Sequence, residues 1–215
     1  MKYGESGFII VYLLFALGAG LWLLGQGDRT VKLMGTAALV LGCGDAFHLV
    51  PRVLNHFVSA DFSLALGLGK LVTSVTMTVF YALLYLLWLR LYRVEPDRKR
   101  DALVFGLAAL RILLCLPPQN GWLQNESPLL WAVLRNLPFT ALGAVTVLQW
   151  YRTRLEKPIF RRLWLYVTLS FLFYLPVALT AGTAPMLGML MLPKTVCYML
   201  ILALFLRWAK RGVRA

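Results

Sequence analysis

Apolar residues run through this chain in seven long segments, and short stretches that carry most of its charge separate them. The segments lie at about 7–25, 31–51, 64–89, 102–117, 128–150, 162–181 and 187–207. A helix rises about 1.5 Å per residue and the hydrocarbon core of a membrane is about 30 Å thick, so segments of this length can serve as spans. They lack the alternation with period two that is typical of membrane β-strands. We therefore expect an all-α fold, a polytopic bundle of seven transmembrane helices that forms a single domain over residues 1–215.

The composition supports a membrane protein over a soluble one. The 215 residues are 60% hydrophobic and 14% charged, whereas a soluble domain is nearer half apolar and a quarter charged. A net charge of +13 would suggest nucleic-acid binding in a soluble chain. So apolar a chain is better accommodated in a lipid bilayer, and we expect no nucleic-acid partner.

The positions of the lysines and arginines predict an orientation. Segments 26–32, 90–101, 151–162 and 207–214 hold two, five, five and four of them, which is sixteen of the 22. With seven spans, all four segments fall on one side of the membrane, and only Lys2 and Arg52 fall on the other. Because cytoplasmic loops are enriched in cations, we expect a multi-pass protein of the cell membrane with its N-terminus outside and its C-terminus in the cytoplasm.

Five of the predicted spans carry a charged residue at a similar depth. We expect these residues roughly 9–12 Å below the outer edge of the membrane, from the rise per residue. They are Asp45, Lys70, Arg111, Arg135 and Lys194. Charges inside spans are costly and usually face a bundle interior, which predicts an outward-facing, water-filled cavity rich in cations. The alternative is that each long side chain extends independently to the membrane interface, which suits Asp45 poorly because its side chain is short.

The segment from Gly42 to Arg52 is the richest short motif. Spacings of three and seven place Asp45, His48 and Arg52 on one helical face. An aspartate beside an imidazole can form a proton switch or a general acid–base pair. The alternative is a buried Asp45 neutralised by a cation, with His48 merely hydrogen-bonded. His56 would join this face only if the helix continued past Pro51, which the expected kink argues against.

Other polar residues could complete the lining of the cavity. Arg135-Asn136 precedes Pro138, which predicts a kink, and a polar stripe with helical spacing follows Lys70. The remaining candidates for ligand binding are Asn136, Tyr174 and Tyr198. Four cations against one acid at this depth favour an anionic ligand group. No cofactor and no metal site are expected, because the three cysteines lack paired spacing and the chain has only two histidines.

Similar residues recur at an offset of about 125, which suggests an internal repeat of three spans, a linker span and three more. Ala16–Ala19 matches Ala141–Ala144, Pro51 matches Pro176, and Lys70 matches Lys194. This 3+1+3 topology resembles that of the SWEET sugar transporters and the KDEL receptors, which implies a binding site between the repeats. The Pro-Gln signature of those families is absent from the first and fifth spans, where it would be expected.

Two further likenesses bear on enzymatic activity. Gly44-Asp45 together with Gly67-Leu68-Gly69 is similar to the lysoplasmalogenase membrane family, although Lys70 stands where that family tends to have histidine. The seven-span alkaline ceramidases and adiponectin receptors use several histidines that this chain lacks. A retinal protein is disfavoured because no acid accompanies Lys194 in its span.

Three functions therefore remain open from the sequence. The first is a transporter or receptor that binds an anionic small molecule or a lipid head group. The second is an intramembrane lipid-modifying enzyme of the hydrolase type, with Asp45 and His48 as acid and base. The third is a structural or accessory membrane protein. The sequence leaves the ligand and the oligomeric state open.

Overall fold

The chain folds into a bundle of seven long α-helices. The computed structural model describes residues 2–95, 97–125, 128–180 and 185–212, and these contain helices and no strand. The α-helices are α1 (Lys2–Leu24), α2 (Arg29–Phe57), α3 (Ser63–Tyr92), α4 (Arg98–Cys115), α5 (Leu129–Arg152), α6 (Leu163–Thr180) and α7 (Met191–Gly212). Short 3-10 helices lie at Pro118–Asn120, Pro158–Phe160 and Pro185–Leu190. The expected all-α class is thus confirmed.

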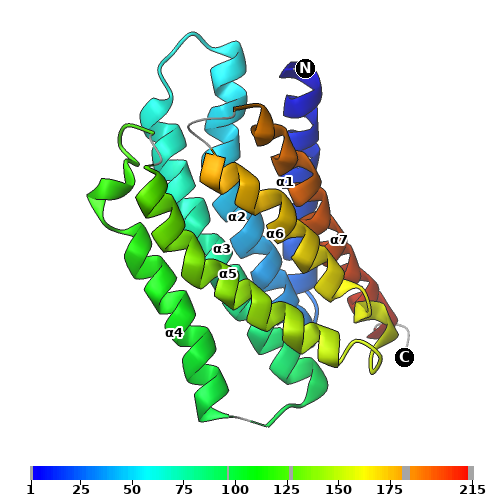
Figure 1. Cartoon of the computed structure of the whole chain (residues 1–215). Helices are drawn as coiled ribbons and strands as arrows, with labels where there is room; N and C mark the ends of the chain where they lie inside the picture. Colours follow the sequence, from blue (N-terminus) through cyan, green and yellow to red (C-terminus); the bar gives the residue numbers. More distant parts are fainter. Residues whose placement is uncertain (1, 96, 126–127, 181–184, 213–215) are drawn as a thin grey trace.

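Consecutive helices run in opposite directions and pack side by side (Figure 1). Helix α7 returns to contact both α1 and α2, which closes the arrangement into a ring, and α3 also contacts α5 across it. The N-terminus and the end of α7 lie at opposite ends of the bundle (Figure 1). We refer to these as the N-terminal end and the C-terminal end.

Six of the helices are long and apolar enough to cross a membrane, namely α1, α2, α3, α5, α6 and α7. Helix α4 is not among them. Its 18 residues begin with the charged run Arg98–Asp101 and include Arg111, so no window of spanning length is sufficiently free of charge. The seventh predicted span therefore stays a prediction, whereas the membrane-spanning character of the chain as a whole rests on the other six helices.

The C-terminal end of α2 differs from the predicted boundary. The helix continues through Pro51 to Phe57, so the expectation that the helix ends near Pro51 is wrong. Proline lacks a backbone N–H and leaves the carbonyl of Phe47 without its usual helical partner, yet packing against α3 holds the helix together. The other end of α2 is capped by Asp28, whose Oδ1 accepts hydrogen bonds from the backbone N–H groups of Thr30 and Val31 at 2.7 and 2.8 Å.

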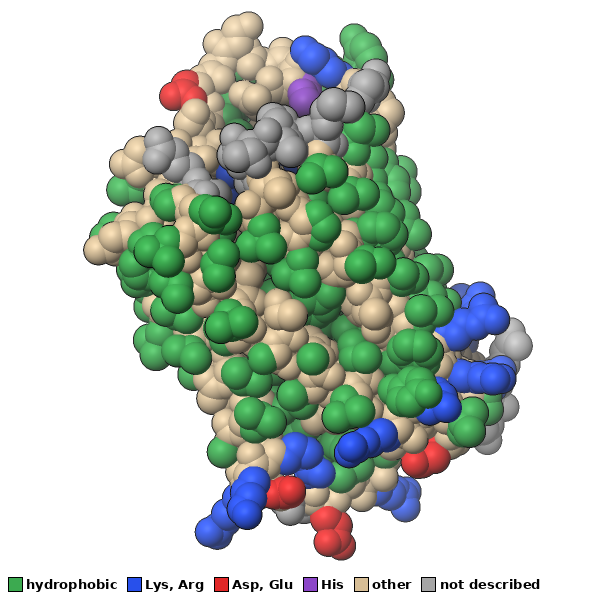
Figure 2. Space-filling view, in the orientation of Figure 1, with side chains coloured by type: hydrophobic (Ala, Val, Ile, Leu, Met, Phe, Trp, Pro, Cys, Tyr) green, Lys and Arg blue, Asp and Glu red, His purple; other side chains and the backbone are tan. Residues whose placement is uncertain are grey.

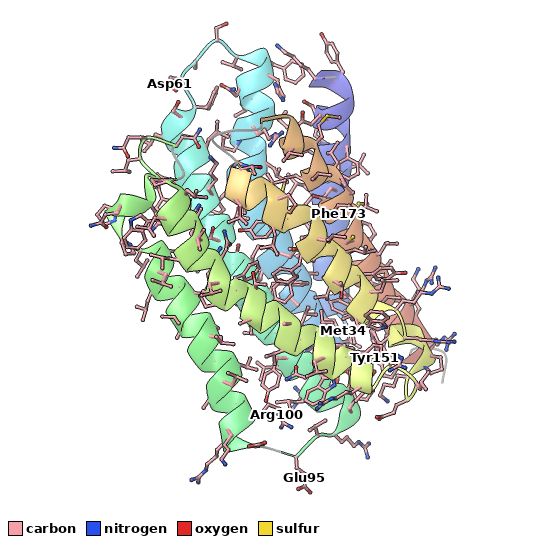
Figure 3. The ribbon with its side chains drawn as sticks, in the orientation of Figure 1. Met34, Asp61, Glu95, Arg100, Tyr151 and Phe173 are labelled. Carbon is pink, nitrogen blue, oxygen red and sulfur yellow. The ribbon has the colours of Figure 1, made fainter. Side chains whose placement is uncertain are left out.

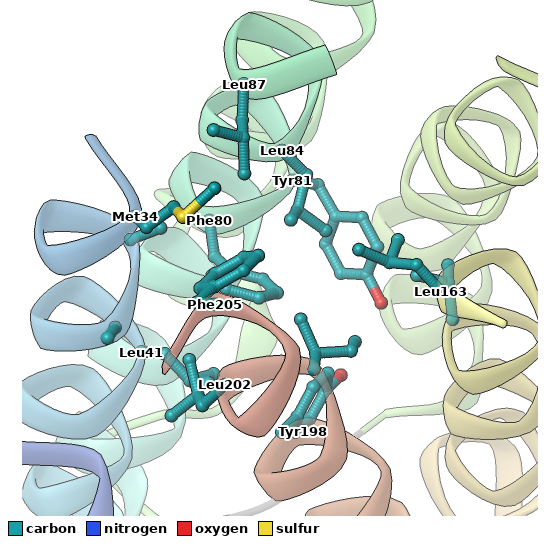
Figure 4. Packing of buried hydrophobic residues seen from close by; sticks show 14 of the residues in the cluster. Met34, Leu41, Phe80, Tyr81, Leu84, Leu87, Leu163, Tyr198, Leu202 and Phe205 are labelled. Carbon is teal, nitrogen blue, oxygen red and sulfur yellow. The ribbon is translucent and has the colours of Figure 1, made fainter. Parts of the chain in front are cut away.

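The helices surround a buried core that is rich in aromatic residues (Figure 4). Phe80 of α3 contacts Tyr198 of α7 edge to face, with ring centroids 5.9 Å apart. Tyr81 contacts Phe139 and Phe171, both at 5.3 Å, and its hydroxyl lies 3.1 Å from Ser170 Oγ. Aromatic pairs in this geometry add to the gain from apolar burial. This buried aromatic cluster lies across the middle of the bundle, and we call it the aromatic floor.

Apolar and charged side chains occupy different parts of the surface along the length of the bundle. Exposed apolar side chains cover the middle of the face seen in Figure 2, and lysines and arginines gather towards its C-terminal end. Acidic side chains occur at both ends, with Asp61 at one and Glu95 at the other (Figure 3). Hydrogen bonds from the hydroxyl and the backbone N–H of Ser63 lower the pKa of Asp61, so this exposed carboxylate is ionised at neutral pH.

Small residues allow α2 and α3 to approach closely, as the glycine pairs in their sequences predict. A Cβ atom at Gly69 would overlap the carbonyl oxygen of Phe47, and one at Gly44 would overlap the side chain of Thr76. Thr73 Oγ1 donates a hydrogen bond to Gly44 O at 2.9 Å across the same contact. Close helix packing of this kind is characteristic of small residues within membranes.

This contact yields a prediction about stability. We expect Gly69→Ala to lower the free energy of unfolding by about 1–3 kcal/mol, because the added methyl group meets backbone rather than a movable side chain. Thermal unfolding of the purified protein in detergent measures the change. Gly106→Ala in α4 is the matched control: no atom lies within 4 Å of its Cβ position, and a helical alanine is favoured by up to about 1 kcal/mol. Equal unfolding midpoints for the two variants would contradict the prediction.

Candidate functional site

A cavity of about 300 Å³ opens among α2 to α7 above the aromatic floor, towards the N-terminal end. Five of its lining side chains are basic and one is acidic, and the rest are polar or apolar. Eight of the ten residues predicted to bind a ligand lie in this lining, and they are Asp45, His48, Arg52, Lys70, Arg111, Arg135, Tyr174 and Lys194. The predicted convergence of charges from different helices is therefore present in the structure. That they bind a ligand stays a prediction.

The charged residues lie at different distances from the ends of their own helices, and the common membrane depth that the sequence suggests stays a prediction. Asp45 lies about 18 Å from the end of α2 because that helix continues beyond Pro51. Arg111 lies about 6 Å from the end of α4 and Arg135 about 9 Å from the start of α5. The cavity thus extends from the ends of α4 and α5 down to the middle of α2.

Arg111 is the most deeply buried cation in the cavity. It is 1% exposed, and neither its Nε nor its Nη1 has a hydrogen-bond partner among the described residues. The guanidinium carbon lies 5.0 Å from the centroid of the Phe139 ring, and such a cation–π contact offsets only part of the cost of burying the charge. Two hydrogen-bond donors of a buried cation are thus left without a partner among the described residues.

Arg135 is held by a connecting segment, residues 116–125, from which Trp122 contributes to the lining of the cavity. Its Nη1 donates a hydrogen bond to Asn120 Oδ1 at 2.8 Å, and its guanidinium carbon lies 4.5 Å from the ring of Trp122. Asn120 in turn donates to the carbonyls of Leu114 and Pro117, both at 3.0 Å. Trp122 Nε1 donates to Cys115 O at 2.8 Å. These bonds satisfy carbonyl groups at the end of α4 and hold the segment in place.

The role of Asn120 gives a second prediction. We expect Asn120→Ala to lower the free energy of unfolding by about 2–3 kcal/mol, because a buried arginine and several backbone carbonyls lose their partner together. Limited proteolysis should also cleave residues 116–125 faster than in the wild type. Gln119→Ala, at an exposed neighbouring position, serves as the control and should leave both measurements unchanged. An intact segment in Asn120→Ala would contradict this role.

Asp45 is the only acidic residue in the described lining of the cavity. It is 7% exposed, and its Oδ2 accepts a hydrogen bond of 2.6 Å from the hydroxyl of Tyr12 in α1. Lys194 of α7 interacts electrostatically with Asp45 but forms no ion pair with it within 4.0 Å. The ammonium group of Lys194 lies 4.9 Å and 5.4 Å from the ring centroids of Tyr174 and Tyr198. Asp45 thus opposes the cations of the cavity without pairing closely with any of them.

Arg52 and the two histidines lie nearer the N-terminal end. Arg52 Nε donates to Glu5 Oε1 at 2.6 Å, and His56 Nε2 lies 3.7 Å from Glu5 Oε2. The expectation that the kink separates His56 from the helix was wrong, but His56 faces Glu5 of α1 and does not line the cavity. His48 does line it, and its Nδ1 is buried without a hydrogen-bond partner among the described residues. His48 and Asp45 thus line the same cavity.

The polar stripe of α3 is mainly structural. Ser74 and Thr78 donate to the carbonyls of Lys70 and Ser74, each at 2.8 Å and four residues earlier, which is the usual behaviour of hydroxyls within helices. Lys70 reaches the carbonyl of Asn125 in the connecting segment at 3.5 Å. Among the residues of this stripe, only Lys70 adds a charge to the cavity, through its amino group.

Two predicted ligand-binding residues lie outside the lining. Asn136 accepts a hydrogen bond of 2.8 Å from the hydroxyl of Tyr174. It therefore positions Tyr174, which lines the cavity, without lining the cavity itself. Tyr198 is 2% exposed and belongs to the aromatic floor. Neither side chain lines the cavity itself, and contact of either with a ligand stays a prediction.

Sequence reasoning missed several residues that complete the site. Tyr12, Asn120, Trp122 and Phe139 hold or face its charged groups. A tyrosine within an otherwise apolar first span was a signal that could have located Tyr12, since a buried hydroxyl needs a partner. Among the described residues, no group of three histidine, cysteine, aspartate or glutamate side chains is arranged to hold a metal ion.

Comparison with known proteins adds no relative to this picture. No protein-family model, curated protein or solved structure matches the chain. The function must therefore be argued from the cavity.

Proposed function

We propose that this protein crosses the cell membrane seven times and binds an anionic small molecule or lipid head group in its cationic cavity, as a transporter or receptor. The observation that carries the proposal is Arg111, a fully buried guanidinium with donors that no described residue satisfies. Lys70, Arg135 and Lys194 line the same space against one acid, Asp45, while Arg52 is paired with Glu5. An anion would satisfy these groups together.

The proposed topology places the cavity on the outer side. Helix α4 lies alongside α3 and α5 (Figure 1), which supports a seventh crossing in which neighbouring helices shield its charged residue, Arg111. With seven crossings the termini lie on opposite sides, and the cation-rich C-terminal end faces the cytoplasm. The pair Lys70 and Lys194, which the suggested repeat relates, lines one cavity, which is compatible with the 3+1+3 arrangement.

Anion-dependent stabilisation tests this proposal. We expect millimolar inorganic phosphate or a small carboxylate to raise the thermal stability of the purified protein, by about 2.7 kcal/mol at a hundred times its dissociation constant. The comparison is chloride at equal ionic strength. Arg90→Gln, an exposed cation outside the cavity, should respond like the wild type. Absence of a response to every anion tested would overturn the proposal and favour the accessory role.

A hydrolase is the second candidate, favoured by one observation: Asp45 and the unpartnered His48 Nδ1 lie in the same cavity as the cations. In that case His48 would act as the acid or base and the arginines would hold a phosphate. Mass spectrometry of lipids from cells that express the wild type or His48→Gln distinguishes the candidates. A lipid product that requires His48 supports the enzyme, whereas unchanged lipids with anion uptake into proteoliposomes support the transporter.

A further inference from the structure

A smaller cavity of about 130 Å³ adjoins the cationic cavity on the side of α1. The two share five lining residues from α2, the 3-10 helix before α7, and α7: Leu49, Arg52, Gly188, Met191 and Thr195. We call this smaller space the side branch. It lies between α1 and α7, which are in contact with each other, so it leads from the cationic cavity towards the periphery of the bundle.

The lining of the side branch is mainly apolar. Its apolar side chains are Phe8, Ile9, Leu49, Met189, Met191 and Leu192. Met189 is 54% exposed and therefore lies where the branch meets the surface. The branch follows α1 from Glu5 to Tyr12, a distance of about 10 Å. Its position among membrane-spanning helices means that its outer end faces lipid.

The charges of the side branch neutralise each other. Glu5 and Arg52 form an ion pair of 2.6 Å, with side chains 24% and 34% exposed. A second anionic group would find no free cation here, in contrast to the cavity, where Arg111 and Lys194 are unpaired. The site thus has one cationic compartment and one neutral, mainly apolar compartment that adjoins it across shared lining residues.

Because the two cavities adjoin and share lining residues, we infer that the ligand is an amphiphile that consists of a small anionic head, such as a phosphomonoester, and an alkyl chain. The inference rests on the proposed anion site and specifies the class of its ligand. The head binds in the cationic cavity near Arg111, and the chain lies in the side branch between α1 and α7. Such a ligand would enter sideways from the membrane through the side branch, where Met189 is exposed.

Binding of an n-alkyl phosphate series tests the inference. The protein is placed in nanodiscs of neutral phosphatidylcholine, and thermal stabilisation by methyl, butyl, hexyl and octyl phosphate is measured. Each buried methylene contributes roughly 0.8 kcal/mol, which corresponds to about a fourfold gain in affinity. We expect affinity to rise by up to this factor per methylene until the branch is filled.

Two neighbouring residues of α1 provide a matched pair of variants. Ile9 is 4% exposed and lines the branch, whereas Ile10 is 50% exposed and does not. We expect Ile9→Trp to bind methyl phosphate like the wild type but to lose the gain with chain length. Ile10→Trp should keep the gain. Met189→Trp, at the mouth of the branch, is a second blocking variant if Ile9→Trp does not fold.

The outcomes separate failure of the inference from failure of the proposed function. Equal affinity of the wild type for methyl and octyl phosphate, or an undiminished gain in a folded blocking variant, would overturn the amphiphilic ligand and leave the anion site intact. Failure of every alkyl phosphate to bind would overturn both. Equal binding of octyl phosphate to the wild type and to Arg111→Met would show binding that depends only on the chain, which also overturns the inference.

Discussion

Arg111→Met is expected to make the empty protein more stable and to abolish its response to anions. Methionine has a similar length to the apolar stem of arginine and carries no charge. We expect the free energy of unfolding to rise by about 1–4 kcal/mol, which is the range seen when buried ionic groups are replaced by apolar residues of similar volume. The stabilisation by phosphate should disappear in the same variant.

The physical reason is the environment of this one guanidinium. Burial of an arginine that lacks hydrogen-bond partners is unfavourable, and Arg111 gains only the contact with the Phe139 ring at 5.0 Å. Removal of the charge relieves that cost in the empty protein. It also removes the donors that an anion would use, so stability and binding change in opposite directions.

Unfolding midpoints with and without phosphate, at constant ionic strength, measure both effects. Arg90→Met is the control, because Arg90 is exposed at the end of α3 and lies outside the cavity. It should change the free energy of unfolding by less than about 0.5 kcal/mol and keep the anion response. A large loss of stability in Arg111→Met would contradict the prediction, since it would mean that Arg111 holds the bundle together.

The sequence predicted which residues surround the cavity because the rule behind the prediction is strong. A charge within an apolar span is costly in lipid and must face the interior of the bundle or extend to the interface. Lys70, Arg111, Arg135 and Lys194 come from four different helices and all line one space. The helices themselves were predicted for a related reason, since the length of an apolar run follows from the thickness of the membrane.

The details that the sequence did not predict depend on contacts between distant segments. Pro51 normally weakens a helix, yet α2 continues because the α3 backbone at Gly69 packs against the carbonyl of Phe47. Local propensity cannot anticipate such support. The connecting segment likewise depends on tertiary hydrogen bonds of Asn120 and Trp122. Nothing in its short sequence of mixed polar and apolar residues specifies where it folds.

Asn136 and Tyr198, which the sequence placed in the lining, lie outside it for a geometric reason. Asn136 follows Arg135 directly, and adjacent residues in a helix differ in direction by about 100°. When Arg135 faces the cavity, Asn136 faces α6 and accepts the hydrogen bond of Tyr174. Tyr198 lies outside the lining because it is about one helical turn further along α7 than Lys194. At that level of the bundle it belongs to the aromatic floor.

Asp45→Asn is expected to have the opposite effect to Arg111→Met. The amide oxygen can still accept the hydrogen bond from Tyr12, so the change removes a charge and little else. The cavity cations then lack their only acidic neighbour in the described lining. We expect the free energy of unfolding of the empty protein to fall by less than the roughly 3–5 kcal/mol seen when one partner of a close buried ion pair is removed, because no described cation lies within ion-pair distance of Asp45.

The same variant should bind anions more tightly and recover stability when it does. A bound phosphate supplies the negative charge that Asp45 provided, so its stabilising effect should exceed that in the wild type. Unfolding midpoints over a phosphate titration measure this difference. Glu156→Gln is the control, because it removes an exposed carboxylate that lines neither the cationic cavity nor the side branch. It should change the free energy of unfolding by less than about 0.5 kcal/mol, with no gain in anion response.

Together the two variants separate a shared cavity from independent side chains. If each charged residue extended to the interface by itself, Asp45→Asn would leave the anion response of the arginines unchanged. In a shared cavity the acid and the anion compete for the same cations, so loss of Asp45 must strengthen the anion response and loss of Arg111 must weaken it. Weaker phosphate binding by Asp45→Asn would therefore contradict the cavity as a binding site, since the acid would then be assisting the ligand it should oppose.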